Sequence, residues 1–152
     1  MKKSLLTAAV ILSLVTSTGT DAFAKMTPEA HKYYQSACTL ENSQKYKQAL
    51  DDLKKALELS GEDALIYTKM GGLFSELGEW ENALDAYESA AKLRPNDAFI
   101  YISMGNILQT IGDYENAYNA FKHAESIYPE YKYNCLNIAN IEYFRKNYDS
   151  GS

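Results

Sequence analysis

The sequence predicts an all-α fold in which short helices stack as repeated hairpins, and two observations support this prediction. Small residues recur 34 positions apart, as Ala49, Ala83 and Ala117 do, and aromatic residues keep the same interval. The 152 residues also include only three prolines and eight glycines, so helices are permitted along nearly the whole chain. A fixed period of this size is typical of arrays in which each unit buries its apolar face against the next.

The first 24 residues are expected to be a signal peptide rather than part of the fold. Lys2 and Lys3 precede an apolar run, Leu5–Val15, and the segment Ala22–Ala24 has the small-x-small pattern of a cleavage site. The run is about half the roughly 20 residues that a membrane-spanning helix needs. We therefore expect cleavage after Ala24, a mature domain at 25–152 without membrane insertion, and a bacterial protein that is periplasmic or secreted.

The net charge argues against two classes of partner. The full chain carries a net charge of −5, and without Lys2, Lys3 and Asp21 it keeps 13 basic and 19 acidic side chains, a net charge of −6. An acidic protein repels phosphate backbones and anionic lipids. Neither nucleic acid nor a membrane surface is therefore an expected partner.

Each repeat is expected to contain two helices joined by a tight turn. In the central repeat, Asp63 is placed to cap a helix at 65–77, and Gly78 permits the left-handed conformation that ends it. A second amphipathic helix follows and stops at Pro95. The predicted repeats lie at about 30–63, 64–97 and 98–131, and a final helix lies at about 131–146.

The recurring residues resemble the tetratricopeptide repeat. One copy consists of Tyr67, Met70, Gly71, Phe74, Ala83, Tyr87 and Pro95, and a second of Tyr101, Met104, Gly105, Leu108, Ala117, Phe121 and Pro129. The first repeat departs from the pattern, with Ala37 and Gln44 for glycines and Gly61 for proline, as a terminal repeat often does. The resemblance implies a right-handed solenoid of three repeats plus a C-terminal helix. That helix is either the cap of the array or the start of a further repeat in a longer natural chain.

The resemblance also implies that the first helices of successive repeats line a concave groove that binds an extended peptide or a helix. The residues at the corresponding positions are Tyr34, Leu65, Thr68, Gly72, Phe99, Ile102, Asn106, Tyr133, Leu136, Asn140 and Tyr143. The C-terminal half of this set is suited to a hydrophobic segment, Gly72 leaves room for a ligand, and the asparagines can hydrogen-bond a peptide main chain. Some family members bind a terminal carboxylate with basic residues, but Leu65, Thr68, Phe99 and Ser103 occupy the middle of this groove.

A purely structural interpretation of the same residues remains open. Leu65, Phe99 and Ile102 would then pack between repeats, and the C-terminal aromatic residues would cover the end of the array or pair two copies of the chain. The predicted function is therefore a scaffold that binds a protein or peptide partner. The alternative is a homo-oligomeric structural component of an envelope assembly, with no groove ligand.

The sequence predicts neither enzymatic activity nor a cofactor. His31 and His123 lack the nearby histidine, cysteine pair or carboxylate cluster that metal binding or nucleophilic catalysis requires. No phosphate-binding glycine loop is present in the sequence.

The two cysteines are not expected to form an internal disulfide. Cys38 and Cys135 lie in the first and fourth copies of the repeat. Helices pack about 8–10 Å apart, and a disulfide tolerates only about 7 Å between Cα atoms. We expect each cysteine to be a small buried residue, with Cys38 the better candidate for an intermolecular bond.

Overall fold

The computed structural model describes residues 26–148, and within this range the chain forms seven α-helices and no strand. The predicted all-α fold class is thereby confirmed. The predicted signal peptide, residues 1–24, lies outside the described residues. The helices are α2 (Pro28–Asn42), α3 (Tyr46–Ser60), α4 (Ala64–Glu76), α5 (Trp80–Leu93), α6 (Ala98–Thr110), α7 (Tyr114–Ile127) and α8 (Lys132–Tyr148).

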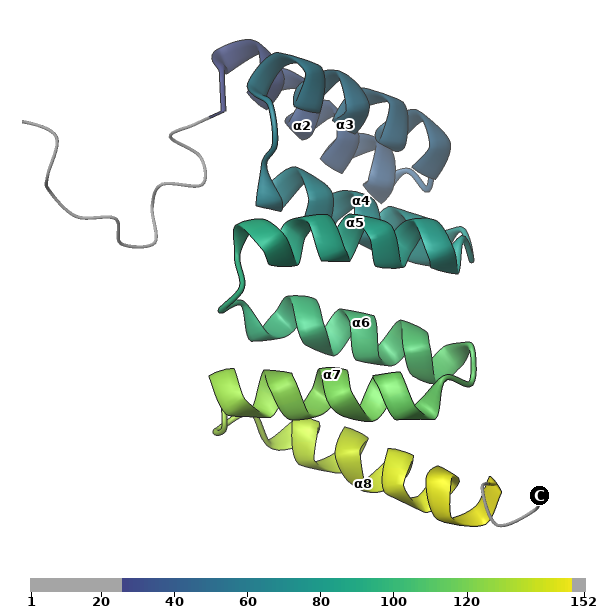
Figure 1. Cartoon of the computed structure of the whole chain (residues 1–152). Coiled ribbons are helices and arrows are strands. Elements are labelled where there is room, and N and C mark those ends of the chain that lie inside the picture. The colour runs from purple at the N-terminus through teal and green to yellow at the C-terminus, as the bar shows by residue number, and fades with distance from the viewer. Residues whose placement is uncertain (1–25, 149–152) are drawn as a thin grey trace, which may run out of the picture.

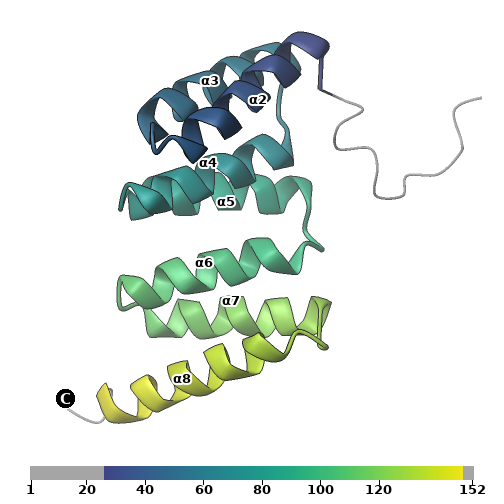
Figure 2. The same cartoon turned by 180° about the vertical axis from the view of Figure 1, so that it is seen from behind.

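The helices stack in chain order, with α2 and α3 at one end of the array and α8 at the other (Figures 1 and 2). All extensive contacts join helices that are consecutive in sequence. The tightest packing is within the pairs α2–α3, α4–α5 and α6–α7, and each pair then packs on the next. The arrangement is a solenoid of three helical hairpins followed by the single helix α8.

Side-chain caps begin the first helix of each hairpin. The Thr27 hydroxyl accepts a hydrogen bond from the Ala30 N–H at 3.2 Å. The Asp63 carboxylate accepts one from the Leu65 N–H at 2.8 Å, which confirms the predicted cap, and Asp97 accepts one from the Phe99 N–H at 3.2 Å. Such caps satisfy N–H groups that have no partner inside the helix and stabilise it by about 1 kcal/mol each.

The turn inside each hairpin has the same backbone conformation. Gly78 and Gly112 have φ of 72° and 83°, and Gln44 has φ of 56° at the corresponding position. In each turn the following N–H donates to a carbonyl five residues earlier, as Glu79 does to Phe74 at 2.9 Å. The first repeat therefore keeps the left-handed turn even though it lacks the glycine.

Glycine permits close packing of the two helices in the second and third hairpins. A Cβ atom at Gly71 would lie 2.7 Å from the Tyr87 ring, and one at Gly105 would lie 2.6 Å from the Phe121 ring. Both rings are buried. In the first hairpin the corresponding residues are Ala37 and Leu53, because a smaller partner leaves space for a methyl group.

Hydrogen-bond, ring and ion-pair contacts attach α8 to α7. The buried Asn134 side chain donates to the Phe121 carbonyl at 2.7 Å. Further along, Phe144 stacks on Tyr114 at 5.2 Å between ring centroids, and Arg145 pairs with Glu115 at 2.7 Å. The last helix is therefore attached along its length.

Candidate functional site

The predicted groove residues lie on the first helices of the hairpins and on α8. Tyr34 belongs to α2, Leu65, Thr68 and Gly72 to α4, Phe99, Ile102 and Asn106 to α6, and Tyr133, Leu136, Asn140 and Tyr143 to α8. Ten of these residues are exposed or half-buried. We call the exposed and half-buried residues of α2, α4, α6 and α8 the first-helix face.

Ile102 does not meet the expectation that it lines the groove. Only 8% of this residue is exposed, and it belongs to the same core cluster as Phe121, Ile138 and Ile141. The isoleucines of α8 belong to the same core as residues of α6 and α7, so Ile102 is buried where these three helices pack together. The structural interpretation is therefore correct for this residue.

In the N-terminal half of the first-helix face, polar side chains contact one another. The Lys69 ammonium on α4 donates to the Glu41 carboxylate on α2 at 2.8 Å. Burial by itself lowers the pKa of Lys69, but the hydrogen bond to Glu41 and its charge outweigh this, so the pKa lies above its ordinary value. Burial, together with the neighbouring Cys38, raises the pKa of the Tyr34 hydroxyl. Sequence reasoning missed Lys69, because its partner is 28 residues away.

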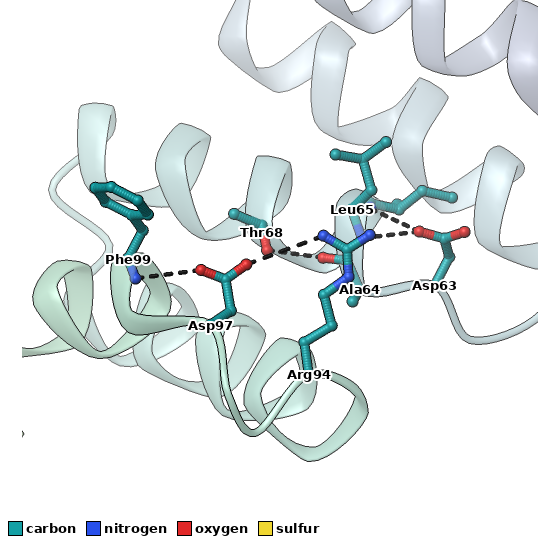
Figure 3. A network of polar contacts seen from close by, with 8 residues as sticks. Asp63, Ala64, Leu65, Thr68, Arg94, Asp97 and Phe99 are labelled. Carbon is teal, nitrogen blue, oxygen red and sulfur yellow. Dashed lines mark hydrogen bonds and ion pairs between the residues drawn. The ribbon is translucent and has the colours of Figure 1, made fainter. Parts of the chain in front are cut away.

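Thr68 and Gly72, two predicted groove positions on α4, differ in how available they are to a ligand. The Thr68 hydroxyl donates to the Ala64 carbonyl at 2.7 Å within the same helix, so its hydrogen is already used (Figure 3). A Cβ atom at Gly72 would meet only the Tyr87 hydroxyl, at 3.8 Å, which is an ordinary contact distance. Unlike Gly71, Gly72 is therefore not required by packing of the described residues.

The C-terminal half of the first-helix face is apolar. The exposed fractions are 55% for Phe99, 69% for Tyr133, 58% for Leu136 and 65% for Tyr143. Helix α6 has no charged residue between Ala98 and Thr110. Asn106 and Asn140 are exposed between these side chains. This half offers apolar area and amide groups but few charges.

Aromatic rings cluster where α6 begins and α7 passes into α8. Phe99 lies 5.5 Å from Tyr131 and 6.2 Å from Tyr128, measured between ring centroids. Tyr131 in turn lies 5.7 Å from Tyr133. We call these four residues the aromatic edge. The Phe99 side chain points away from the Asp97 carboxylate that binds its N–H (Figure 3).

An open pocket of about 810 Å³ adjoins the aromatic edge. Its wall includes Phe99 and Tyr128, together with the loop residues Arg94 and Asn96. The Arg94 guanidinium also lies 4.0 Å from the Asp97 carboxylate, measured between nitrogen and oxygen. The pocket therefore combines ring surface with hydrogen-bond donors.

Both cysteines are free, and they differ in exposure. Cys38 is half-buried on α2, whereas Cys135 is exposed on α8. The expectation that each is buried is therefore not met by Cys38, which is only partly covered, and is wrong for Cys135, because no described helix packs over that side of α8.

Among the described residues, no group of three or more histidine, cysteine, aspartate and glutamate side chains is arranged to hold a metal ion. Over the same range, no helix has the length and apolar character needed to cross a membrane.

Comparison with protein families finds tetratricopeptide repeats along the chain. A family described as "Tetratricopeptide repeat" matches residues 30–63 and 100–131, and one described as "TPR repeat" matches residues 71–112. A comparison with curated proteins found no match.

Solved structures show the same fold at low sequence identity. The Sgt2 tetratricopeptide-repeat domain from Aspergillus fumigatus is 17% identical, with a TM-score of 0.74 over 83% of this chain and 85% of that one. The first such domain of Spaghetti (RPAP3), bound to the HSP90 peptide SRMEEVD, is 15% identical, with a TM-score of 0.70 over 75% and 90%. The Yersinia enterocolitica type III secretion chaperone SycD, in complex with a YopD peptide, is 14% identical, with a TM-score of 0.73 over 78% and 96%.

These matches agree with the element order and turns described above. The chain carries tetratricopeptide repeats, and its described part has the tetratricopeptide-repeat fold.

Proposed function

We propose that this protein is an interaction scaffold that binds an extended peptide or a helical segment along the first-helix face. One observation carries the proposal: Phe99, Tyr133, Leu136 and Tyr143 are the four most exposed of the large apolar residues that the structure describes, and each is more than half exposed. Contiguous exposed apolar side chains usually mark an interface. The peptides bound by Spaghetti and SycD support a polypeptide as partner.

The chemistry of the face limits how such a partner would be held. Because α6 has no charged residue, affinity would come from burial of apolar area and from amide hydrogen bonds. Asn106 and Asn140 are exposed, and their amide groups can both donate hydrogen bonds to and accept them from the main chain of a peptide. The proposal assigns no catalytic role and no cofactor to this protein.

Site-specific photo-crosslinking tests the proposal directly. A benzophenone amino acid at Leu136 should capture a partner from the native extract, whereas the same group at Lys54, which is exposed on α3, should not. With the benzophenone kept at Leu136, the double variant Phe99→Asn with Tyr143→Asn should weaken capture roughly tenfold or more, because it removes two exposed apolar side chains of the face. Ile111→Asn, at an exposed apolar residue outside the face, is the matched control. Equal capture from both crosslinker positions would contradict the proposal.

We further propose that residues 1–24 direct export and are removed, so that the scaffold acts in the periplasm or outside the cell. The basic start, the short apolar run and the Ala22–Ala24 pattern support this part of the proposal. N-terminal sequencing of the protein from fractionated cells should find Lys25 as the first residue. A cytoplasmic protein that retains the first 24 residues would contradict it.

Self-association is the second candidate function, and the exposed stripe on the terminal helix favours it. Tyr133, Leu136 and Tyr143 lie three and seven residues apart on one side of α8. Light scattering coupled to size exclusion distinguishes the two functions. If Leu136→Asn converts an oligomer to a monomer and leaves partner capture intact, the stripe joins copies of the chain.

A further inference from the structure

Two pockets lie at matching places in successive repeats. The first is lined by residues of α4 and α5, and the second by residues of α6 and α7 together with part of α5. Their volumes are about 210 Å³ and about 440 Å³. The residues that line the smaller pocket are Tyr67, Met70, Phe74, Asn82, Asp85, Ala86 and Ser89, and in each case the residue 34 positions later lines the larger one. We call the larger pocket the third-repeat pocket.

The third-repeat pocket has a smaller residue in its wall and reaches one helix further than its counterpart. Leu108 stands where the second repeat has Phe74, and a leucine side chain fills less space than a phenylalanine ring. The pocket also extends to Leu84 and Glu88 on α5, the helix that precedes α6 in the stack (Figures 1 and 2). Three helices from two hairpins therefore line it.

The wall of the third-repeat pocket combines an apolar floor with a polar rim. The floor consists of half-buried residues, which are Leu84, Tyr101, Met104, Leu108 and Ala120. The rim consists of exposed polar residues, which are Glu88, Asn116, Asn119 and His123. The Tyr101 and His123 rings meet edge to face, with 4.2 Å between their centroids. A ligand in this pocket would contact apolar area on the floor and hydrogen-bonding groups at the rim.

The rim contains polar groups that the fold leaves without partners. Neither the Glu88 carboxylate nor the Asn119 amide makes a hydrogen bond or ion pair with another described residue. Glu88 has the only carboxylate among the nine residues that line the pocket, and none of the nine is a lysine or an arginine. On α5, Asp85 and Lys92 lie one turn to either side of Glu88 with opposite charges, and neither pairs with it. The pocket wall therefore carries a negative charge that no described residue neutralises by direct contact.

We propose that the third-repeat pocket binds a small organic cation in which an ammonium group is attached to an aromatic body. Its volume of about 440 Å³ lies within the range of small-molecule sites, about 300–1,000 Å³. The aromatic body would be buried against Tyr101 and Met104, since rings and thioether groups both pack favourably on an aromatic ring. The Glu88 carboxylate would accept charge-assisted hydrogen bonds from the ammonium group. An anion would be repelled by Glu88, and a neutral molecule would lack the ion pair.

This cation site is separate from the proposed polypeptide site. None of the nine residues that line the pocket is among the predicted groove residues, and six of them lie on the second helices α5 and α7. The proposed polypeptide function and the cation site can therefore be tested independently of each other.

The test uses the full chain and three ligands that share an indole ring. Tryptamine has an ammonium group, tryptophol has a neutral hydroxyl group in its place, and indole-3-propionate has a carboxylate. Calorimetry at pH 8, where imidazole is normally neutral and an alkylamine is still protonated, measures their binding. We expect tryptamine to bind at one site per chain. Tryptophol should bind roughly fivefold more weakly, which is the factor expected for a partly exposed ion pair, and indole-3-propionate more weakly still.

Two variants test the volume and the charge of the pocket separately. Leu108→Phe copies Phe74, the residue at the matching position of the second hairpin, so it is expected to fold. By filling the pocket it should weaken tryptamine binding roughly tenfold or more. Glu88→Gln keeps the size of the side chain, so tryptamine affinity should fall roughly fivefold while tryptophol affinity stays unchanged. Glu81→Gln removes the same charge from an exposed position of α5 outside the pocket, and as the matched control it should bind like the parent.

Four results would overturn the proposed cation site. Absence of tryptamine binding to the parent protein would do so, and so would tryptophol binding as tightly as tryptamine. Equal losses of affinity in Glu88→Gln and Glu81→Gln would show that the net charge of the chain, rather than the pocket, attracts the amine. If Leu108→Phe keeps the helical circular dichroism of the parent and binds tryptamine equally well, the amine binds elsewhere.

Discussion

The two halves of the first-helix face use the same repeat frame for different surfaces. On α2 and α4, Lys69 and Glu41 are paired, and Tyr34 is half-buried. On α6 and α8, by contrast, Phe99, Tyr133, Leu136 and Tyr143 project into solvent. The N-terminal half pairs two of its charged groups with each other, and the C-terminal half leaves apolar area exposed.

Comparison of the two halves shows which residues the repeat constrains. Gly71 and Gly105 determine how closely the two helices of a hairpin approach. A side chain at either position would collide with a buried ring. Positions one residue further along the helix, Gly72 and Asn106, meet no such constraint and vary between repeats. Function is therefore expected at variable positions between fixed ones.

Inside the array, the first and third hairpins form the sharpest comparison. A small residue faces a large one in each, but the pair is Ala37 and Leu53 in the first hairpin and Gly105 and Phe121 in the third. The two members of each pair differ together. A substitution that changes only one member of a pair should therefore destabilise the fold more than a substitution that changes both.

The largest expected effect comes from Gly105→Ala. The added Cβ atom would lie 2.6 to 2.8 Å from three atoms of the fully buried Phe121 ring, so the ring or the helix must move. We expect the free energy of unfolding to fall by about 2 kcal/mol, as overpacking usually costs 1–3 kcal/mol. Chemical denaturation at constant slope measures the change.

Phe121→Leu should rescue Gly105→Ala, because the double variant recreates the pair found in the first hairpin. The double variant is expected to be more stable than Gly105→Ala alone, which gives a coupling energy of about 1 kcal/mol in a double-mutant cycle. Gly112→Ala, also on the third hairpin but with nothing within 4 Å of its Cβ position, separates packing from backbone strain. Strictly additive effects would show that the pairs are independent.

A second contrast concerns Asn134, which lies 34 residues after Ile100 and 68 after Ile66. All three are buried, and the Asn134 Oδ1 has no hydrogen-bond partner among the described residues. Asn134→Ile should raise the free energy of unfolding by about 1 kcal/mol, because it removes an unsatisfied polar atom and adds apolar burial. The Phe121 carbonyl, which Asn134 binds, keeps its partner within α7.

Thermal and denaturant unfolding measure this change, with Asn140→Ile as a control at an exposed position of the same helix. A loss of stability in Asn134→Ile would mean that the 2.7 Å bond to Phe121 holds α8 more strongly than burial of the amide opposes it.

The sequence was sufficient to predict much of this structure, because repeated local rules determine it. The Asp63 cap and the turn at Gly78 follow from residue type and spacing, and both occur as predicted. Burial of Ile102 could not be predicted in the same way, since it depends on how α8 lies against α6 and α7. The Lys69–Glu41 contact likewise joins separate helices. Local patterns specify helices and turns, whereas exposed fractions and pairings depend on packing.

The next prediction concerns the N-terminal, polar half of the first-helix face. Glu41→Gln should lower the free energy of unfolding by up to about 1 kcal/mol at neutral pH, because the ion pair is only partly screened by solvent. The folded-state pKa of Lys69 is raised, so its contribution is present below its ordinary pKa and is lost as pH rises through the folded value. The difference between parent and variant should thus shrink only in the alkaline range, above about pH 10.4.

Unfolding free energies of both proteins across this pH range test the sign. Lys122→Gln, at another lysine that is paired with a carboxylate but more exposed, is the control and should change stability little. If the difference between parent and Glu41→Gln disappeared already near neutral pH, the Lys69 pair would not be its source.

The smallest expected effect lies at the turn that distinguishes the first hairpin from the others. Gln44 adopts φ of 56°, which costs a non-glycine residue about 1–2 kcal/mol, and its side chain is exposed. Gln44→Gly removes this strain but increases the entropy of the unfolded chain by about 0.4–1 kcal/mol. We therefore expect a net stabilisation of about 0.5 kcal/mol in denaturant unfolding. The reverse change, Gly78→Gln, should destabilise by a similar amount, because Gly78 has φ of 72° in the matching turn. Stabilisation by Gln44→Gly without destabilisation by Gly78→Gln would show that the two turns are not equivalent, and the frame shared by the hairpins would then not extend to their turns.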